Sequence, residues 1–229
     1  MSANTRFEPK TPFGRIVHSF EETAIAVLMG LMTLVTFINV VLRYGFDSSL
    51  IWGLEVTLIL FAWLVLFGIS YGFKITSHLG VDAVTNMFSP SGRKLLGLIA
   101  AACCLIYAFL LAKGAWDYWA PFAALQPTDG RWFPLGFTEG VRDRAFYETD
   151  QVPMLGIFRF LEDLINYGDE YEKLPRVIPY AILPVAALLM LFRLVQATIA
   201  IWRGDQESLI VSHEAEEAVQ DAAALNRED

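Results

Sequence analysis

The chain has 229 residues, of which 55% are hydrophobic, with a formal net charge of -8 and a mean hydropathy of +0.45. The negative charge does not suit nucleic acid or an anionic lipid surface as a partner. Four separate apolar runs, each about 20 residues long, exclude an ordinary soluble domain, because that length crosses a hydrocarbon core as a helix. We predict an all-α integral membrane protein with four transmembrane helices, amphipathic interfacial helices and a long external loop.

In chain order, the sequence divides into five segments. We expect a cytoplasmic N-terminal segment at 1–20, transmembrane helices one to three within 21–119, an external loop at 120–176, the fourth transmembrane helix at 177–203 and an acidic cytoplasmic tail at 204–229. The four helices are predicted at about 22–42, 50–73, 91–116 and 178–202. The first run lacks a small-x-small cleavage site and is expected to remain as an anchor.

Shorter elements are expected between these helices. Apolar residues at helical spacing predict a brief interfacial helix within 79–88. In the external loop an amphipathic helix is predicted, with Arg159, Glu162, Asp163 and Asn166 on its polar face. Its apolar face would carry Met154, Leu155, Ile157, Phe158, Leu161, Leu164 and Ile165. Pro184 is expected to kink the fourth helix.

Lysine and arginine in the short flanks predict the orientation of the chain. The N-terminal flank carries Arg6, Lys10 and Arg15, whereas the turn after the first helix carries only Arg43. We therefore expect both termini and residues 74–94 in the cytoplasm.

Polar residues gather where the first two helices meet. Asn39 and Arg43 are four apart, Trp52 and Glu55 three apart, and each pair shares a helix face. A carboxylate below the membrane surface needs a partner. We predict an Arg43–Glu55 ion pair that locks the hairpin or docks a neighbouring subunit; the alternative is a ligand for an ion or substrate.

Two further polar groups are expected at the inner surface. Lys74, His78 and Asp82, each four apart, would line one face of a continuing helix. His78 is interpreted as a solvated or capping residue, with a proton relay as the alternative. Arg193 lies deep in the fourth helix and is expected to snorkel or to pair with an acid, the candidates being Glu21, Glu22 and Asp82.

No cofactor, metal or catalytic site is predicted. The sequence shows no phosphate loop, dinucleotide fingerprint or metal-ligand cluster. Cys103 and Cys104, the only cysteines, are adjacent in an apolar run and are expected to pack rather than react. Nor do two halves of the chain repeat an interrupted apolar segment, which would mark a self-sufficient carrier. The polar pattern indicates an accessory to transport; the alternatives are a membrane redox subunit and a membrane adaptor that signals through the acidic tail.

Three motifs in order resemble the small membrane subunit of tripartite ATP-independent periplasmic (TRAP) transporters. They are the run 39–44 (NVVLRY), Trp52-x-x-Glu55 and the run 78–82 (HLGVD). The family often has two adjacent acids after the tryptophan, whereas here Leu54 takes the first place. The segments 171–180 and 210–216 are most similar to the C4-dicarboxylate branch.

This resemblance implies a partner-dependent role in a bacterial inner membrane. In such systems a large elevator-type membrane subunit moves substrate with sodium in symport, and a periplasmic binding protein delivers it. The small subunit would enlarge the static scaffold, contact membrane lipids and help to dock the binding protein. The expected subunit contacts are Asn39, Arg43, Tyr44, Trp52, Glu55, His78, Asp82 and Arg193, and the expected docking residues are Arg131, Arg142 and Arg144.

Overall fold

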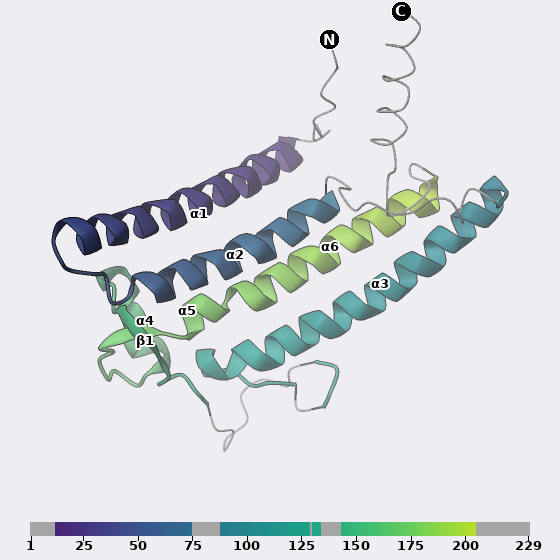
Figure 1. Cartoon of the computed structure of the whole chain (residues 1–229). Coiled ribbons are helices and arrows are strands. Elements are labelled where there is room, and N and C mark those ends of the chain that lie inside the picture. The colour runs from purple at the N-terminus through teal and green to yellow at the C-terminus, as the bar shows by residue number, and fades with distance from the viewer. Residues whose placement is uncertain (1–11, 75–87, 129, 134–142, 205–229) are drawn as a thin grey trace, which may run out of the picture. The chain divides into compact units, whose positions relative to one another are not determined.

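A computed structural model describes residues 12–74, 88–128, 130–133 and 143–204 (Figure 1). Its long helices are α1 (Pro12–Gly45), α2 (Gly53–Lys74), α3 (Pro90–Trp119) and α6 (Ile182–Arg203). The shorter elements are η2 (Ala120–Ala123), β1 (Glu148–Pro153), η3 (Gly156–Phe158), α4 (Phe160–Ile165), β2 (Lys173–Pro175) and α5 (Val177–Tyr180).

The four predicted membrane helices are confirmed among the described residues. Four helical stretches are long and apolar enough to cross a membrane: His18–Gly45, Gly53–Gly72, Ser91–Ala123 and Val177–Arg203. The first helix begins at Pro12, earlier than expected. A proline is tolerated at the start of a helix, since its missing N–H would have no partner there and its φ already suits the helix.

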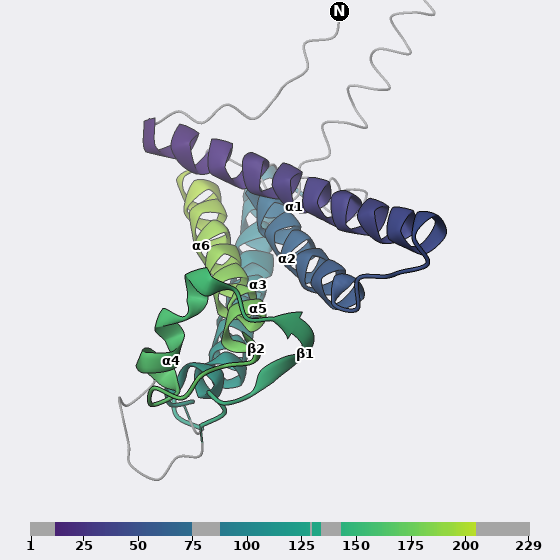
Figure 2. The same ribbon diagram turned by 90° about the vertical axis from the view of Figure 1, so that its left-hand side faces the viewer.

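A tight turn joins α1 to α2 (Figure 2). Asn39 Oδ1 accepts the Leu50 N–H at 3.0 Å and ties the turn back to α1. A Cβ at Gly53 would lie 3.1 Å from Leu50 Cβ and 3.8 Å from Val35 Cγ1. Glycine therefore lets α2 begin close against the side chains of α1 and the turn.

The fourth membrane segment is interrupted at a single residue, Ala181, between α5 and α6. Pro184 has no N–H to give to the carbonyl of Tyr180, which explains the break and agrees with the predicted kink. The Trp63 indole of α2 donates to the Pro179 carbonyl at 3.0 Å, just before this break. Such side-chain donors are what make a broken helix tolerable at membrane depth.

Part of the segment between α3 and α5 folds into a small structure, which we call the loop module (residues 120–128 and 143–176). Strands β1 and β2 pair antiparallel, with Glu148 opposite Pro175, Pro153 opposite Lys173 and a register shift between them. Its core combines Phe122, Ala145 and Ile165 with Val177 of α5. The edge of the Tyr180 ring also packs on Phe122, with ring centroids 5.0 Å apart.

The predicted amphipathic helix at 154–166 is wrong in length and in part of its pattern. The chain forms the short η3 and α4 instead, and a strand pair that was not predicted. Glu162, expected on the polar face, is only 9% exposed, whereas Leu164 is 70% exposed. Glu162 Oε1 accepts the Arg159 guanidinium at 2.9 Å and the Tyr171 N–H at 3.1 Å, and these bonds offset the cost of burial.

The chain divides into two compact units, and the second comprises residues 70–109 and 189–229. Among its described residues, Ala108 of α3 packs with Met190 and Leu194 of α6, and Cys104 lies against this cluster. Lys94 Nζ donates to the Trp202 carbonyl at 2.8 Å. The expected packing role therefore fits Cys104, while Cys103 is exposed.

Candidate functional site

The Glu55 carboxylate, in the first turn of α2, holds two consecutive amides of β1. Oε1 accepts the Asp150 N–H at 2.9 Å, and Oε2 accepts the Gln151 N–H at 2.7 Å. Successive N–H groups of a regular strand point to opposite edges, so this contact fits the irregular register of β1. Hydrogen bonds to an ionised acceptor are short and strong, and an acid also suits the start of a helix.

The predicted ion pair between Arg43 and Glu55 is not present in the described structure. Both carboxylate oxygens of Glu55 face β1, and no ion pair joins it to Arg43. The predicted position of Glu55 below the membrane surface correctly indicated that its carboxylate needs a partner. It could not show that the partner comes from a strand 95 residues further along the chain.

Two basic side chains, Lys173 and Arg176, also bind β1. Arg176 Nε donates to the Glu148 carbonyl at 2.7 Å, and its Nη2 contacts Asp150 Oδ1 at 3.1 Å. Lys173 Nζ donates to the Asp150 carbonyl. A small open pocket of about 300 Å³ is lined by Arg176, Phe146, Tyr147 and Glu148. The segment that Glu55 binds is therefore held by side chains on both sides.

Tyr171 anchors the buried side of the loop module. It is 2% exposed, and its hydroxyl donates to the Ala145 carbonyl at 2.5 Å. Burial raises the pKa of Tyr171 to about 12, and the carboxylates of Glu148, Asp143 and Glu162 add to the rise. The phenol is thus kept neutral and available as a donor.

The end of α3 is fastened to the loop module by Asp117, which the sequence reasoning missed. Its carboxylate accepts the Thr128 N–H at 2.6 Å and the Thr128 hydroxyl at 2.8 Å, and it pairs with Lys113 at 2.7 Å. The signal in the sequence was an acid four residues after a lysine at the end of an apolar run. In such a place an acid needs local partners.

Two tryptophans at the end of α3 make specific hydrogen bonds to the loop module and to α5. The Trp119 indole donates to the Val177 carbonyl at 2.8 Å, and the Trp116 indole donates to the Gln126 carbonyl at 3.1 Å. Tryptophan combines a large apolar body with one N–H donor, which suits it to such junctions.

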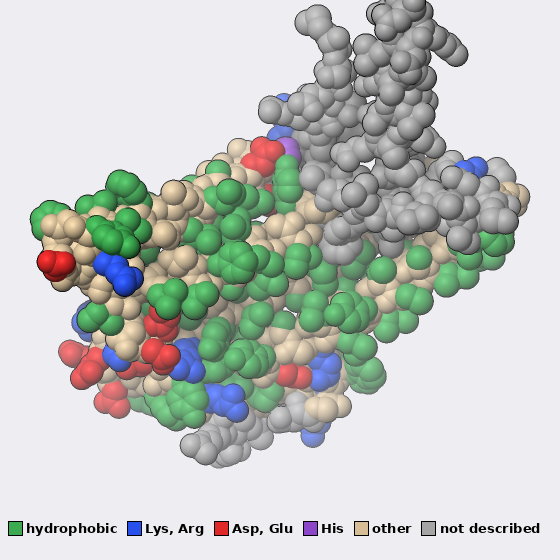
Figure 3. Space-filling model, viewed as in Figure 1, with side chains coloured by type: hydrophobic (Ala, Val, Ile, Leu, Met, Phe, Trp, Pro, Cys, Tyr) green, Lys and Arg blue, Asp and Glu red, His purple; other side chains and the backbone are tan. Residues whose placement is uncertain are grey.

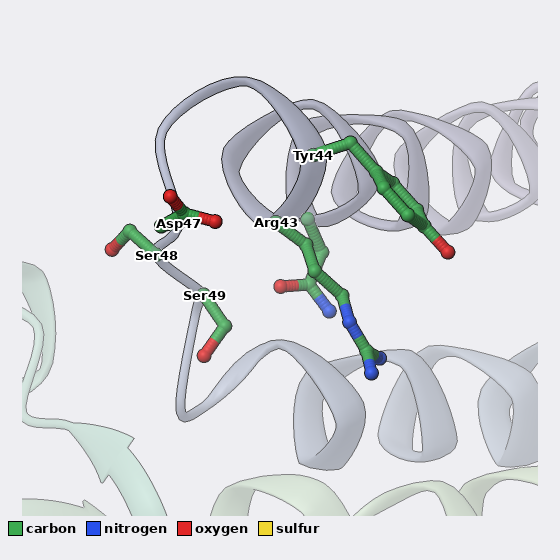
Figure 4. A pocket seen from close by; sticks show the side chains of 6 residues that line it. Arg43, Tyr44, Asp47, Ser48 and Ser49 are labelled. Carbon is green, nitrogen blue, oxygen red and sulfur yellow. The ribbon is translucent and has the colours of Figure 1, made fainter.

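The turn between α1 and α2 forms an open pocket of about 590 Å³ (Figure 4). Its lining includes three of the predicted contact residues, Asn39, Arg43 and Tyr44, together with Asp47, Ser48 and Ser49. Tyr44 is 82% exposed, whereas Trp52 is half-buried at the start of α2. The structure therefore brings part of the predicted motif together but separates it from Glu55.

The remaining predicted residues are scattered. Arg193 contacts Gln196 Oε1 at 3.1 Å and lies 5.7 Å from the Phe192 ring centroid. Arg131 and Arg144 are exposed in the loop region, and the Arg144 guanidinium lies 6.0 Å from the Phe122 ring centroid. The predictions for His78, Asp82 and Arg142 fall outside the described residues.

We predict that Glu55→Gln loosens β1, because an amide offers one acceptor oxygen and no charge. Losing a charge-assisted bond should cost about 1.5–3 kcal/mol. Amide hydrogen exchange at Asp150 and Gln151 should therefore accelerate by at least about tenfold. Asp163→Asn, an exposed acid in α4, is the control and should leave these two amides unchanged. Equal exchange in wild type and Glu55→Gln would show that the carboxylate does not hold the strand.

The raised pKa of Tyr171 predicts a pH-dependent loss of stability in the loop module. The phenol has its ordinary pKa of 10.0 in the unfolded chain and a pKa of about 12 in the folded one, so the unfolded chain releases its proton first as pH rises. The Tyr171 contribution to stability is complete below pH 10 and declines between pH 10 and 12. Comparing the pH dependence of unfolding for wild type and Tyr171→Phe should isolate this decline. Parallel curves would contradict it.

Comparisons with known proteins agree with this architecture. Residues 32–137 match the family described as "Tripartite ATP-independent periplasmic transporters, DctQ component". A Vibrio cholerae protein, the C4-dicarboxylate TRAP transporter small permease protein DctQ, is 44% identical over 215 residues, covering 94% of this chain and 84% of the relative. A Pseudomonas aeruginosa protein of the same name is 34% identical over 131 residues, covering 45% of this chain and 62% of the relative. The chain belongs to the family of TRAP transporter small permease subunits, which are transport components and not enzymes.

Proposed function

We propose that this chain is the small subunit of a sodium-coupled importer of C4-dicarboxylates such as succinate, malate and fumarate. It works with a large membrane subunit and a periplasmic binding protein in a bacterial inner membrane, with both termini in the cytoplasm. The observation that carries the proposal is the 44% identity to the Vibrio cholerae protein over 94% of this chain. The relatives from Pseudomonas aeruginosa and Rhodobacter capsulatus carry the same C4-dicarboxylate name.

The surface of α1 supports a scaffold role. None of the most apolar stretch of its span is buried within the chain, and large apolar side chains are exposed along it (Figure 3). One set recurs at helical spacing: Val27, Leu31, Leu34, Ile38 and Val41. Gly30 and Thr33 are also exposed, and a Cβ at Gly30 would meet nothing within 4 Å. Small residues let another membrane helix approach closely, so we assign this helix to the contact with the large subunit.

The loop module supports a docking role. Glu55 at the start of α2 and Asp117 at the end of α3 hydrogen-bond to it, so it offers a partner a surface that is held in place by two helices. Arg144 is exposed in the loop module and Arg131 is exposed just after residue 128, and both suit an acidic partner surface. Of the predicted subunit contacts, Tyr44, Trp52 and Arg193 stay proposals, as do His78 and Asp82. Glu55 acts indirectly, by holding β1.

We expect the purified chain in liposomes to take up no succinate by itself. Uptake should require the large subunit and the binding protein, and it should need an inward sodium gradient. The measurement is radiolabelled succinate uptake with each component omitted in turn. Robust uptake by this chain alone would overturn the proposal, and uptake unaffected by removing sodium would overturn the coupling.

We also expect Arg131, Arg142 and Arg144, replaced together by Ala, to weaken uptake when the binding protein is limiting. Rim charges mainly speed association, so raising the concentration of binding protein should restore the rate. Arg203→Ala, an exposed arginine at the end of α6, is the matched control. Co-purification of the large subunit must persist in the triple variant. An unchanged uptake rate at limiting binding protein would exclude docking through these arginines.

A further inference from the structure

The pocket at the turn between α1 and α2 has a place and a chemistry that the proposed function does not use. It lies between the C-terminus of α1 and the N-terminus of α2, both of which are membrane-spanning by length and composition. A short turn between two such helices lies at the membrane surface, at the level of lipid head groups.

One side of the pocket offers a cation. Arg43 is exposed, and the described parts of the chain give its guanidinium no ion pair or hydrogen bond. Figure 4 shows the Arg43 side chain extending from the end of α1, across the pocket from the turn that carries Asp47, Ser48 and Ser49. A guanidinium fork matches a phosphate group.

The other side of the pocket offers an anion that is fixed in place. Asp47 lies at φ 46, in the left-handed region that few residues other than glycine, asparagine and aspartate adopt. The turn is closed by the Phe46 and Ser48 N–H groups, which donate to the Leu42 carbonyl at 3.0 and 3.1 Å. The Asp47 carboxylate lies on this turn, across from Arg43 (Figure 4).

We propose that this pocket binds the head group of phosphatidylethanolamine. The phosphate would contact Arg43 on one side of the pocket, and the primary ammonium would contact Asp47 on the other. A purely anionic head group would meet the Asp47 carboxylate unpaired, and a choline head group brings no N–H donor to it. Phe46 and Ile51, which flank the pocket, are 72% and 73% exposed and suit the acyl chains.

The test measures the lipid retained by the full-length chain. The chain is purified in mild detergent, exposed to equal amounts of phosphatidylethanolamine, phosphatidylglycerol and phosphatidylcholine, and examined by native mass spectrometry. Wild type should retain phosphatidylethanolamine preferentially. Arg43→Gln should lower its retention by about tenfold, as expected for losing a charge-assisted contact. Arg203→Gln, an equal change of charge at an exposed site outside the pocket, should have no effect.

Two conservative variants separate recognition from folding. Asparagine tolerates the left-handed backbone, so Asp47→Asn should keep the turn while losing the preference for phosphatidylethanolamine over phosphatidylglycerol. Arg43→Lys keeps a cation and should retain more lipid than Arg43→Gln. Equal losses in both Arg43 variants would overturn the proposal, as would a wild type that holds all three lipids equally.

A further outcome would assign the pocket to a protein partner. If Arg43→Gln keeps its phosphatidylethanolamine but loses the large subunit on co-purification, the guanidinium binds a protein carboxylate and the proposal is wrong. Because the readout is lipid bound to this chain, either result leaves the proposed role in dicarboxylate uptake to be judged by the uptake experiment.

Discussion

The two hydrogen bonds from β1 to the Glu55 carboxylate join the start of α2 to the loop module. A charge in the first turn of a membrane helix and a pair of amides on a free strand edge are each costly to leave unpaired near hydrocarbon. The carboxylate accepts both amides, in hydrogen bonds of 2.7 and 2.9 Å, so neither the charge nor the amides are left unpaired. The start of α2 and the fold of the loop module are therefore a single structural feature, although 95 residues separate them in the chain.

Other polar groups near the ends of the long helices also need hydrogen-bond partners. Trp63 supplies a donor to the carbonyl of Pro179 at the break in the fourth segment, and Trp119 does so for Val177. Asp117 supplies acceptors to Thr128 where α3 gives way to the loop. In each case a side chain of a long helix satisfies a backbone group of α5 or of the loop module, where the regular helical hydrogen bonding of the membrane spans is interrupted. The aromatic residues at these ends are thus structural as well as interfacial.

The sequence was sufficient for the membrane helices, because a run of about 20 apolar residues has few alternatives to spanning. It was insufficient for the loop module. The strand sequences ETDQVP and KLP show no clean alternation of apolar and polar residues. Their pairing depends on side chains that are distant in sequence, Glu55 among them, and no local pattern contains that information. Glu162 was misplaced for the same reason, since its burial is offset by the Tyr171 N–H from beyond the helix.

The single acid after Trp52 leaves the start of α2 with one carboxylate, and β1 occupies it. Leu54 occupies the position where the resemblance led us to expect another acid, and it is 71% exposed. A carboxylate at that position would face the surroundings, so it would not replace Glu55 on β1. With both oxygens of Glu55 bound to amides, α2 offers no carboxylate to Arg43. The Arg43 guanidinium, which makes no ion pair with the described residues, can therefore bind a phosphate at the membrane surface.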